Sequence, residues 1–221
     1  MYEYQYPRPA LTADCVVFAL DSESVKVLLI QRSNAPYCGQ WAFPGGFAAE
    51  GETIEQTAAR ELAEETHLEG IRLQQFHTFS GIGRDPRGWT VSVAFIACIN
   101  KDCMRAVLGG DDAAQAHWFP LDELPTLVFD HEEIFRAALA ELKNLMFSEP
   151  VAFSLLNPIF TSDDVDILFS NLIGEDIDIF KWLSRMQKEG LVKIHNKDIP
   201  SYRFDRKAYE KRTAYEKIYF L

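Results

Sequence analysis

The sequence lacks any segment suited to cross a membrane or to direct secretion. No apolar run approaches the roughly 20 residues that a membrane-spanning helix needs. The first ten residues, MYEYQYPRPA, lack the basic-then-apolar pattern of a signal peptide. These absences predict a cytoplasmic protein with no membrane partner.

Cysteine is scarce, and its spacing argues against a disulfide framework. The four cysteines form no CxxC pair, and three of them lie in or beside apolar runs; they are Cys15, Cys38, Cys98 and Cys103. Cysteine is among the residue types most often buried as a free thiol. We therefore expect a small buried thiol at each position.

Basic residues are in short supply over most of the chain. The 221 residues include 33 acidic and 22 basic ones, for a net charge of −11, of which residues 1–148 carry −10. Residues 149–180 hold seven acids and no base, whereas residues 181–221 hold 11 basic and five acidic residues. An acidic body with a basic last segment indicates two units with different partners. The length suffices for one large domain or a domain with an appendage.

One stretch, residues 44–68, is rich in glutamate and contains a glycine pair; it reads PGGFAAEGETIEQTAARELAEETHL. A glycine pair, Gly45 and Gly46, permits a tight turn and a close approach of the backbone to a ligand. Thr53 and Gln56 fit a capping box, which predicts that a helix starts near Thr53.

Carboxylates are concentrated on one side of this helix. At 3.6 residues per turn, Glu61, Glu64 and Glu65 fall within an arc of about 100°. Glu61 and Glu65 stand at i and i+4, where like charges repel, and Arg60 alone cannot neutralise the group. A bound Mg²⁺ or Mn²⁺ ion could, because these cations prefer oxygen ligands. The alternative is a solvated acidic helix face.

The spacing of these residues resembles the Nudix box, a long and restrictive motif. His67 stands where the family has a glycine that closes the helix; histidine adopts the left-handed conformation less easily. The residues at the matching positions are Gly46, Glu52, Arg60, Glu61, Leu62, Glu64, Glu65 and Leu68.

The resemblance implies a metal-dependent hydrolase that cleaves a nucleoside diphosphate derivative with water. Its metal would be held by the Gly45 carbonyl together with Glu61, Glu64 and Glu65, and Arg60 would orient the carboxylates. Glu52 would belong to the outer shell of the metal. The general base stays open between a box glutamate and two later residues, Asp111 and Asp112.

The surrounding pattern predicts an α/β fold over about the first 147 residues. Strand-like and helical segments alternate there, as a sheet sandwiched by helices requires. The strands are expected at 13–20, 25–31, 41–43, 71–80, 89–98 and within 109–124, with a second long helix from Asp130 to about Met146. We interpret His131 at the start of that helix as structural.

The loop 81–88, GIGRDPRG, carries two arginines that would suit a pyrophosphate beside a metal site. Arg84 and Arg87 are thus candidate substrate-binding residues, and a solvated hairpin loop is the alternative. This loop, the segment YPRPALTADCVVF and the segment FDHEEI resemble the branch that includes ADP-ribose hydrolases and related sensors. ADP-ribose is accordingly the expected substrate, hydrolysed to AMP and ribose 5-phosphate. Phe79 and Trp89 are candidate stacking partners for its base, or ordinary core aromatics.

The last seventy residues predict two helices across a tight turn and then a β-hairpin. Thr161 or Ser162 would cap the first helix, Gly174 would end it, and the second would span 176–188. This order resembles the winged helix of Nudix-related transcriptional regulators. We expect a Nudix domain at 1–148 and a winged-helix-like domain at 149–221.

The second of these helices carries a basic stripe suited to DNA phosphates, formed by Lys181, Arg185 and Lys188. Acidic residues at its start would repel DNA, although they also suit the positive end of the helix dipole; they are Glu175, Asp176 and Asp178. The rival hypothesis is therefore a homodimeric regulator that senses ADP-ribose or a sugar metabolite and binds an operator. A third alternative makes the tail a dimerisation or packing module on a plain hydrolase.

Overall fold

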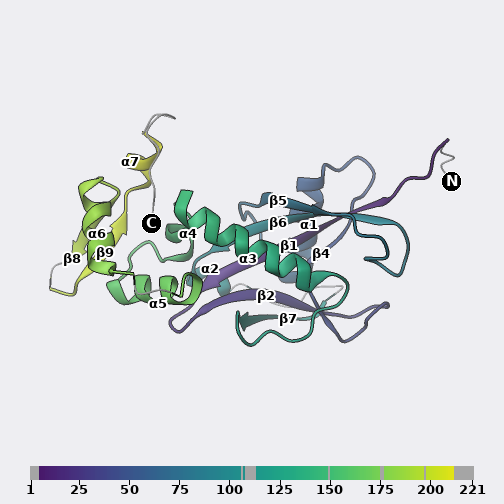
Figure 1. Ribbon diagram of the computed structural model, residues 1–221, viewed down its shortest axis with the longest axis horizontal. Helices are drawn as coiled ribbons and strands as arrows, with labels where there is room; N and C mark the ends of the chain where they lie inside the picture. The colour runs from purple at the N-terminus through teal and green to yellow at the C-terminus, as the bar shows by residue number, and fades with distance from the viewer. Residues whose placement is uncertain are drawn as a thin grey trace. The chain divides into compact units, whose positions relative to one another are not determined.

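The computed structural model describes most of the chain (Figure 1). The described residues are 5–105, 107, 113–148, 150–174, 177–196 and 198–211. Four acidic residues that the sequence analysis singled out lie outside them, namely Asp111, Asp112, Glu175 and Asp176. Within the described part of the chain, no helix has the length and apolar character to span a bilayer.

Contacts between Cα atoms divide the chain into two compact units. The first comprises Met1–Phe18, Val27–Ala97 and Arg105–Leu139, and the second comprises Ala19–Lys26, Cys98–Met104 and Ala140–Leu221. The last change of unit falls inside one helix, so a domain boundary at residues 148 and 149 stays a prediction.

A seven-stranded sheet forms the centre of the first unit. Its strands are β1 (Ala10–Leu20), β2 (Val25–Arg32), β3 (Trp41–Ala42), β4 (Gly45–Phe47), β5 (Gln74–Phe79), β6 (Thr90–Ile99) and β7 (Ala113–Pro120). The order is β3-β2-β1-β6-β5, with β4 paired to β1 and β7 paired to β2. The strands predicted at 13–20, 25–31, 71–80 and 89–98 are thereby confirmed.

Strand β1 is nearly continuous in apolar residues because both of its faces are covered. Every residue from Thr12 to Leu20 is buried. Helix α3 (His131–Ser148) buries the apolar side chains of one face, among them Ile134, Ala138 and Leu142. A short helix that the sequence analysis did not foresee, α2 (Lys101–Met104), follows β6. The predicted α/β fold class is confirmed.

Helix α1 (Ile54–Thr66) begins and ends as the sequence predicts. Thr53 is the N-cap, and its side chain accepts from the Gln56 N–H while the Gln56 side chain accepts from the Thr53 N–H. The C-cap is His67, whose φ of 62° and ψ of 16° place it in the left-handed region. Histidine therefore adopts the conformation that the glycine of the motif would adopt more easily.

The second unit contains the predicted pair of helices followed by a hairpin. Its elements are α4 (Ala152–Leu155), α5 (Ser162–Leu172), α6 (Ile179–Lys188), β8 (Val192–Asn196), β9 (Ser201–Phe204) and α7 (Arg206–Glu210). Thr161 caps α5 through a capping box with Asp164. Asp178 caps α6 by accepting a hydrogen bond from the Lys181 N–H. This capping role explains the acidic side chain at the start of the helix.

An aromatic core holds these small elements together. Phe153 stacks on Phe204 with ring centroids 4.0 Å apart and on Trp182 at 5.6 Å. Phe169 meets Trp182 edge-on at 5.2 Å. Because large rings bury much apolar surface for few ordered residues, such a cluster can stabilise a unit of this size without disulfides.

The expectation of a buried thiol at every cysteine is confirmed for Cys15 and is wrong for Cys38. All four cysteines are free; Cys98 and Cys103 are partly buried, and Cys38 is exposed. Cys38 lies in the loop between β2 and β3, where its thiol donates to the Ser33 carbonyl at 3.1 Å. It is the cysteine farthest from an apolar run, so its exposure follows from its surroundings.

The left-handed cap of α1 gives a direct test of stability. His67→Gly should raise the free energy of unfolding by about 1 kcal/mol, because glycine adopts positive φ without a Cβ clash. Urea denaturation of the full chain measures the change. His67→Ala keeps the Cβ and should bring no comparable gain, whereas equal gains in both variants would contradict the explanation.

Candidate functional site

The glycine turn before α1 brings strand β4 against both strand β1 and helix α1. Gly45 lies opposite Asp14 of β1 in the strand register. A Cβ atom on Gly45 would lie 2.1 Å from the carbonyl oxygen of Ala13. A Cβ atom on Gly46 would lie 2.4 Å from the carboxyl carbon of Glu61. Neither position has room for a side chain, so the backbone passes directly beside the carboxylates of α1.

Arg60 holds three carboxylates in ion pairs. Its Nε and Nη2 atoms donate to the two oxygens of Glu52 at 2.7 and 3.0 Å. Its Nη1 atom donates to Glu61 at 2.8 Å and to Glu64 at 3.0 Å. The hydrogen bonds from Arg60 lower the pKa of Glu52 to about 2, so this carboxylate stays ionised. These contacts agree with the orienting role that the motif implies for Arg60.

Glu65 faces the glycine turn. The side chain is buried, and its Oε2 atom accepts from the Gly45 N–H at 2.8 Å. The motif implies that the Gly45 carbonyl is a metal ligand. In the structure, the N–H group of Gly45 also has a specific partner, the Glu65 carboxylate. The turn and the helix are thus joined by a charge-assisted hydrogen bond.

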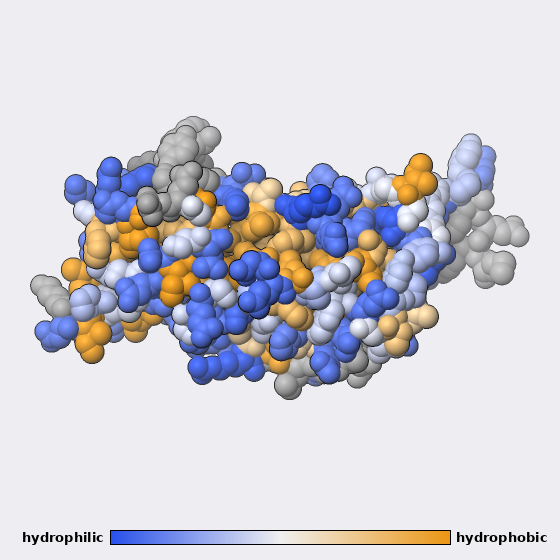
Figure 2. Space-filling model, turned by 60° about the horizontal axis from the view of Figure 1, so that its bottom comes forward, coloured by the Kyte–Doolittle hydropathy of each residue, from blue (hydrophilic) through white to orange (hydrophobic). Residues whose placement is uncertain are grey.

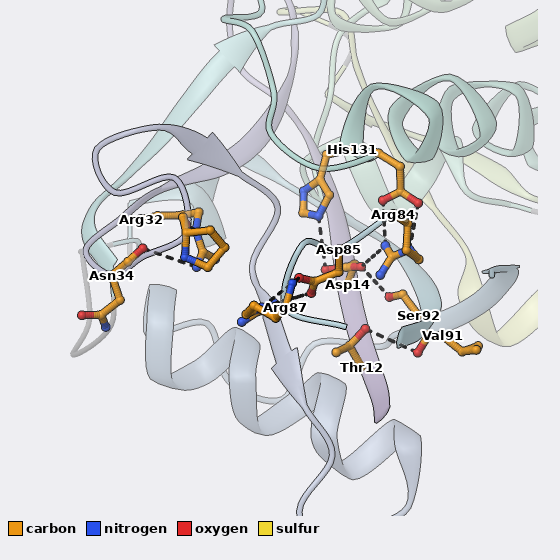
Figure 3. Close-up of polar contacts among 12 residues, drawn as sticks. Thr12, Asp14, Arg32, Asn34, Arg84, Asp85, Arg87, Val91, Ser92 and His131 are labelled. Carbon is orange, nitrogen blue, oxygen red and sulfur yellow. Dashed lines mark hydrogen bonds and ion pairs between the residues drawn. The ribbon is translucent and has the colours of Figure 1, made fainter. Parts of the chain in front are cut away.

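An open pocket lies next to the glycine turn (Figure 3). Its empty volume, including solvent at the mouth, is about 360 Å³. Its walls are charged, which suits a polar ligand. The lining residues are Thr12, Asp14, Arg32, Phe43, Gly45, Gly46, Arg84, Asp85, Arg87, Phe129 and His131.

Asp14 is the centre of a buried polar group in this pocket. Its Oδ2 atom accepts a short hydrogen bond from the Ser92 hydroxyl and lies 3.5 Å from Nη2 of Arg84. Its Oδ1 atom lies 3.6 Å from Nε2 of His131. Figure 3 shows these side chains converging on Asp14 from different elements.

His131 is held as a neutral ring by its surroundings. Its Nδ1 atom accepts from the Phe43 N–H at 2.9 Å, so the ring proton must be on Nε2, facing Asp14. Burial lowers the pKa of His131, which also favours the neutral form. The side chain thus links the start of α3 to the strand before the glycine turn, as a structural histidine would.

Arg84 and Arg87, predicted to bind a pyrophosphate, both line the pocket but are paired with carboxylates. Arg84 donates to Asp130 through Nε at 2.8 Å and Nη2 at 2.7 Å. Arg87 donates to Asp85 through Nε and Nη2, at distances of 2.7 to 3.1 Å. The loop is therefore part of the site, and its guanidinium groups are already in bidentate pairs. The candidate stacking residues Phe79 and Trp89 are not among the lining residues.

The sequence of residues 8–138 matches the NUDIX domain family. The chain belongs to the Nudix family. It is similar to the ADPR responsive transcriptional repressor NtrR of Acinetobacter baylyi, with 31% identity over 191 residues, 85% of this chain and 76% of the relative. It is also similar to the ADP-ribose pyrophosphatase of Methanocaldococcus jannaschii, with 40% identity over 131 residues, 59% of this chain and 73% of the relative.

Solved structures of this kind share the Nudix fold. Shewanella oneidensis NrtR complexed with a 27mer DNA is 28% identical, with a TM-score of 0.76 over 94% of this chain and 99% of that one. The NUDIX domain of the same protein complexed with ADP ribose is 34% identical, with a TM-score of 0.57 over 64% of this chain and 94% of that one. The first likeness extends over both units.

Nudix hydrolases generally use divalent metals, and the chemistry of this site fits one. All candidate donors are oxygens, which hard divalent cations prefer, and Gly46 leaves the space beside Glu61 free of a side chain. Glu61, Glu64 and Glu65 would hold the ion. In the part of the chain described, however, no three acidic, histidine or cysteine side chains converge as a ligand group. Arg60 engages Glu61 and Glu64 instead, so a cation would compete with it.

Sequence reasoning did not single out Asp14, Arg32 or Phe129 as site residues. Asp14 is a charged residue inside an otherwise apolar strand, which is a signal for a specific partner. Phe129 precedes α3 with a φ of 57°, a conformation that the local sequence does not predict. Arg32 ends β2, and only the fold brings it to the pocket.

The basic stripe of α6 is accessible in part. Lys181 and Lys188 are exposed, and Arg185 is half-buried. Phe180, which the sequence analysis passed over, is 73% exposed at the start of the helix, and Ile194 in the hairpin is 51% exposed. On the face drawn in Figure 2, apolar atoms form small groups between hydrophilic ones.

Gly46 gives a test of the crowding at the carboxylates. Gly46→Ala should displace Glu61 and weaken Mn²⁺ binding by about tenfold or more, because the added Cβ would lie 2.4 Å from its carboxyl carbon. Electron paramagnetic resonance of Mn²⁺ titrated into the protein measures the affinity. Gly81→Ala is the matched control, since a Cβ there meets nothing within 4 Å. Unchanged Mn²⁺ affinity in Gly46→Ala would contradict a metal site at Glu61.

Proposed function

We propose that this protein is a cytoplasmic, Mg²⁺-dependent hydrolase that cleaves ADP-ribose to AMP and ribose 5-phosphate. The observation that carries the proposal is the complete set of motif carboxylates on a capped helix, placed beside a pocket with cationic walls. The similarity to an ADP-ribose pyrophosphatase over 131 residues supports this choice of substrate.

The residues of the site divide the work by their contacts. Glu61, Glu64 and Glu65 would hold the cation, and Arg60 orients the side chains of Glu61 and Glu64. The Gly45 N–H fixes Glu65 by a hydrogen bond. When bound, the metal polarises the phosphoryl oxygens and lowers the pKa of the attacking water. The arginine-lined pocket receives the diphosphate.

Substitution of one carboxylate tests the hydrolase directly. Glu64→Gln should lower Mg²⁺-dependent turnover of ADP-ribose by about a hundredfold or more, because metal-derived stabilisation of the transition state amounts to several kcal/mol. Phosphate release coupled to a phosphatase measures it over ADP-ribose, other nucleotide sugars, dinucleoside polyphosphates and NADH.

Exposed Glu69, just beyond the helix, provides the control for this experiment. Glu69→Gln should keep wild-type turnover. Wild-type turnover in Glu64→Gln would contradict the assignment of the metal site. Turnover of a different compound, lost in Glu64→Gln, would keep the hydrolase and replace the substrate.

A second function, regulation of transcription, is favoured by the second unit. In this proposal a homodimer senses ADP-ribose and binds DNA through a winged helix formed by α5, α6 and the β8–β9 hairpin. The likeness to an ADPR-responsive repressor over 85% of the chain supports it, as does the likeness to a DNA complex over 94% of the chain. Exposed Phe180 lies in the first turn of α6, where recognition helices contact bases, and apolar side chains can contact the thymine methyl.

A gel-shift experiment with the DNA upstream of the protein's own gene tests this proposal. Lys181→Gln combined with Lys188→Gln should weaken binding and reduce the slope of log affinity against log salt by about 2, one for each phosphate that the variant no longer neutralises. Lys143→Gln, an exposed position on α3, is the control. Identical slopes for the double variant and the wild type would contradict DNA binding by α6.

A further inference from the structure

The three arginines of the pocket differ in what neutralises them. Arg84 is 5% exposed in its side chain and forms a bidentate pair with Asp130. Arg87 forms a bidentate pair with Asp85. Each of these two guanidinium groups therefore meets a full negative charge within the protein, which leaves little driving force to bind another anion.

Arg32 has no such bidentate partner in the described part of the chain. Among the residues that the structure describes, no carboxylate lies within ion-pair distance of its guanidinium. Its Nε atom donates to the Pro36 carbonyl at 2.9 Å, and its Nη2 atom lies 3.5 Å from the Asn34 carbonyl (Figure 3). Neutral carbonyls satisfy donors but leave the positive charge in place. A guanidinium has five N–H donors, and these two contacts use only some of them.

The guanidinium of Arg32 is held in place from two sides. The loop after β2 is closed by backbone hydrogen bonds that join Arg32 to Gly39 at 2.7 Å and to Gln40 at 2.9 Å. On the other side, the ring of Phe129 lies 5.1 Å from the guanidinium carbon, within cation–π distance. The edge of Tyr37 in turn packs on Phe129, with centroids 5.0 Å apart.

Phe129 holds its position in an unfavourable backbone conformation. Its φ of 57° is uncommon for a bulky side chain, and such strain persists where the surrounding structure requires it. The same ring lies 5.5 Å from the guanidinium carbon of Arg87. The two arginines are thus gathered around one ring at the pocket.

Among the described residues, this arrangement leaves a guanidinium without an ion pair where an anion would fit. Burial, first, and the charge of Arg87 lower the pKa of Arg32, whereas the more distant carboxylates of Glu65, Asp85 and Asp14 act in the opposite direction. Arg32 lines the same pocket as Gly45 and Gly46, which adjoin the carboxylates of α1. An anion between Arg32 and a cation at those carboxylates would meet positive charge on both sides.

We propose that Arg32 is the pocket residue that binds the phosphates of the ligand, whereas Arg84 and Arg87 maintain the pocket through their ion pairs. The proposal rests on the function proposed above and narrows it to one residue and one chemical group. It replaces the expectation that the two arginines of the loop 81–88 bind the pyrophosphate.

Calorimetric titration of the full chain in metal-free buffer tests this role with three probes: inorganic pyrophosphate, ADP-ribose and adenosine. Arg32→Gln should weaken binding of the two phosphate compounds by about 10- to 100-fold, the usual worth of charge-assisted hydrogen bonds, and leave adenosine unchanged. Arg32→Lys should recover part of the loss, because it keeps the charge without the planar fork. Arg136→Gln on α3 is the control, since Arg136 is bonded to a carbonyl of its own helix.

Thermal unfolding without ligand separates this role from a structural one. Arg32→Gln should lower the melting temperature less than Arg84→Gln does, because it removes a hydrogen bond to a carbonyl and a cation–π contact but breaks no ion pair among the residues described. Arg84→Gln should lower the melting temperature, because Asp130 would lose its buried partner. A melting temperature lowered as far in Arg32→Gln as in Arg84→Gln, with equal losses for adenosine and pyrophosphate, would overturn the proposal.

The remaining outcomes distinguish failure of the phosphate site from failure of the proposed substrate. Loss of pyrophosphate binding in Arg84→Gln but not in Arg32→Gln would overturn the proposal. If the wild type binds pyrophosphate but not ADP-ribose, and Arg32→Gln abolishes that binding, the phosphate site stands and the proposed substrate fails. A wild type that binds neither compound would overturn the phosphate site.

Discussion

The close approach of the glycine turn to its two neighbours is the constraint on which the site depends. Without side chains, Gly45 and Gly46 let one short strand contact the sheet and the carboxylate helix at the same time. The hydrogen bond from Gly45 to Glu65 joins the two, and the register of β4 on β1 brings Asp14 to the same place. Pocket and helix are therefore parts of one rigid arrangement.

Charge balance is the second organising feature of the site. Arg60 bridges Glu52, Glu61 and Glu64, and in the pocket Asp130 and Asp85 take up two of the three arginines. These ion pairs neutralise most of the charged side chains of the site. Specific binding of an anion then depends on the charged side chains that form no ion pair among the described residues.

Local signals foretold much of the fold. The capping box at Thr53 predicted the start of α1, the apolar periodicity located the main strands, and Gly174 marked the end of α5. Each of these features depends on residues within a few positions of one another. The carboxylates of α1 were also found from spacing alone, because their geometry is that of a single helix.

The pocket could not be assembled in this way. Arg84 meets Asp130, which lies 46 residues later, and Asp14 meets Ser92 across 78 residues. Sequence alone gives arginines near a predicted metal site but not which of them are already paired. Phe129, which has a positive φ, likewise meets Tyr37 and the two arginines only through the tertiary fold.

The burial of Cys15 has a practical consequence. Its thiol lies between β1 and α1, where it donates to the Ala58 carbonyl at 3.4 Å, and burial raises its pKa well above the usual value. The thiolate that reacts with alkylating reagents is therefore nearly absent while helix and sheet stay together. Cys38, exposed on a loop, reacts without any opening. One chain thus carries an exposed reference thiol and a buried thiol whose alkylation would report the separation of helix α1 from the sheet.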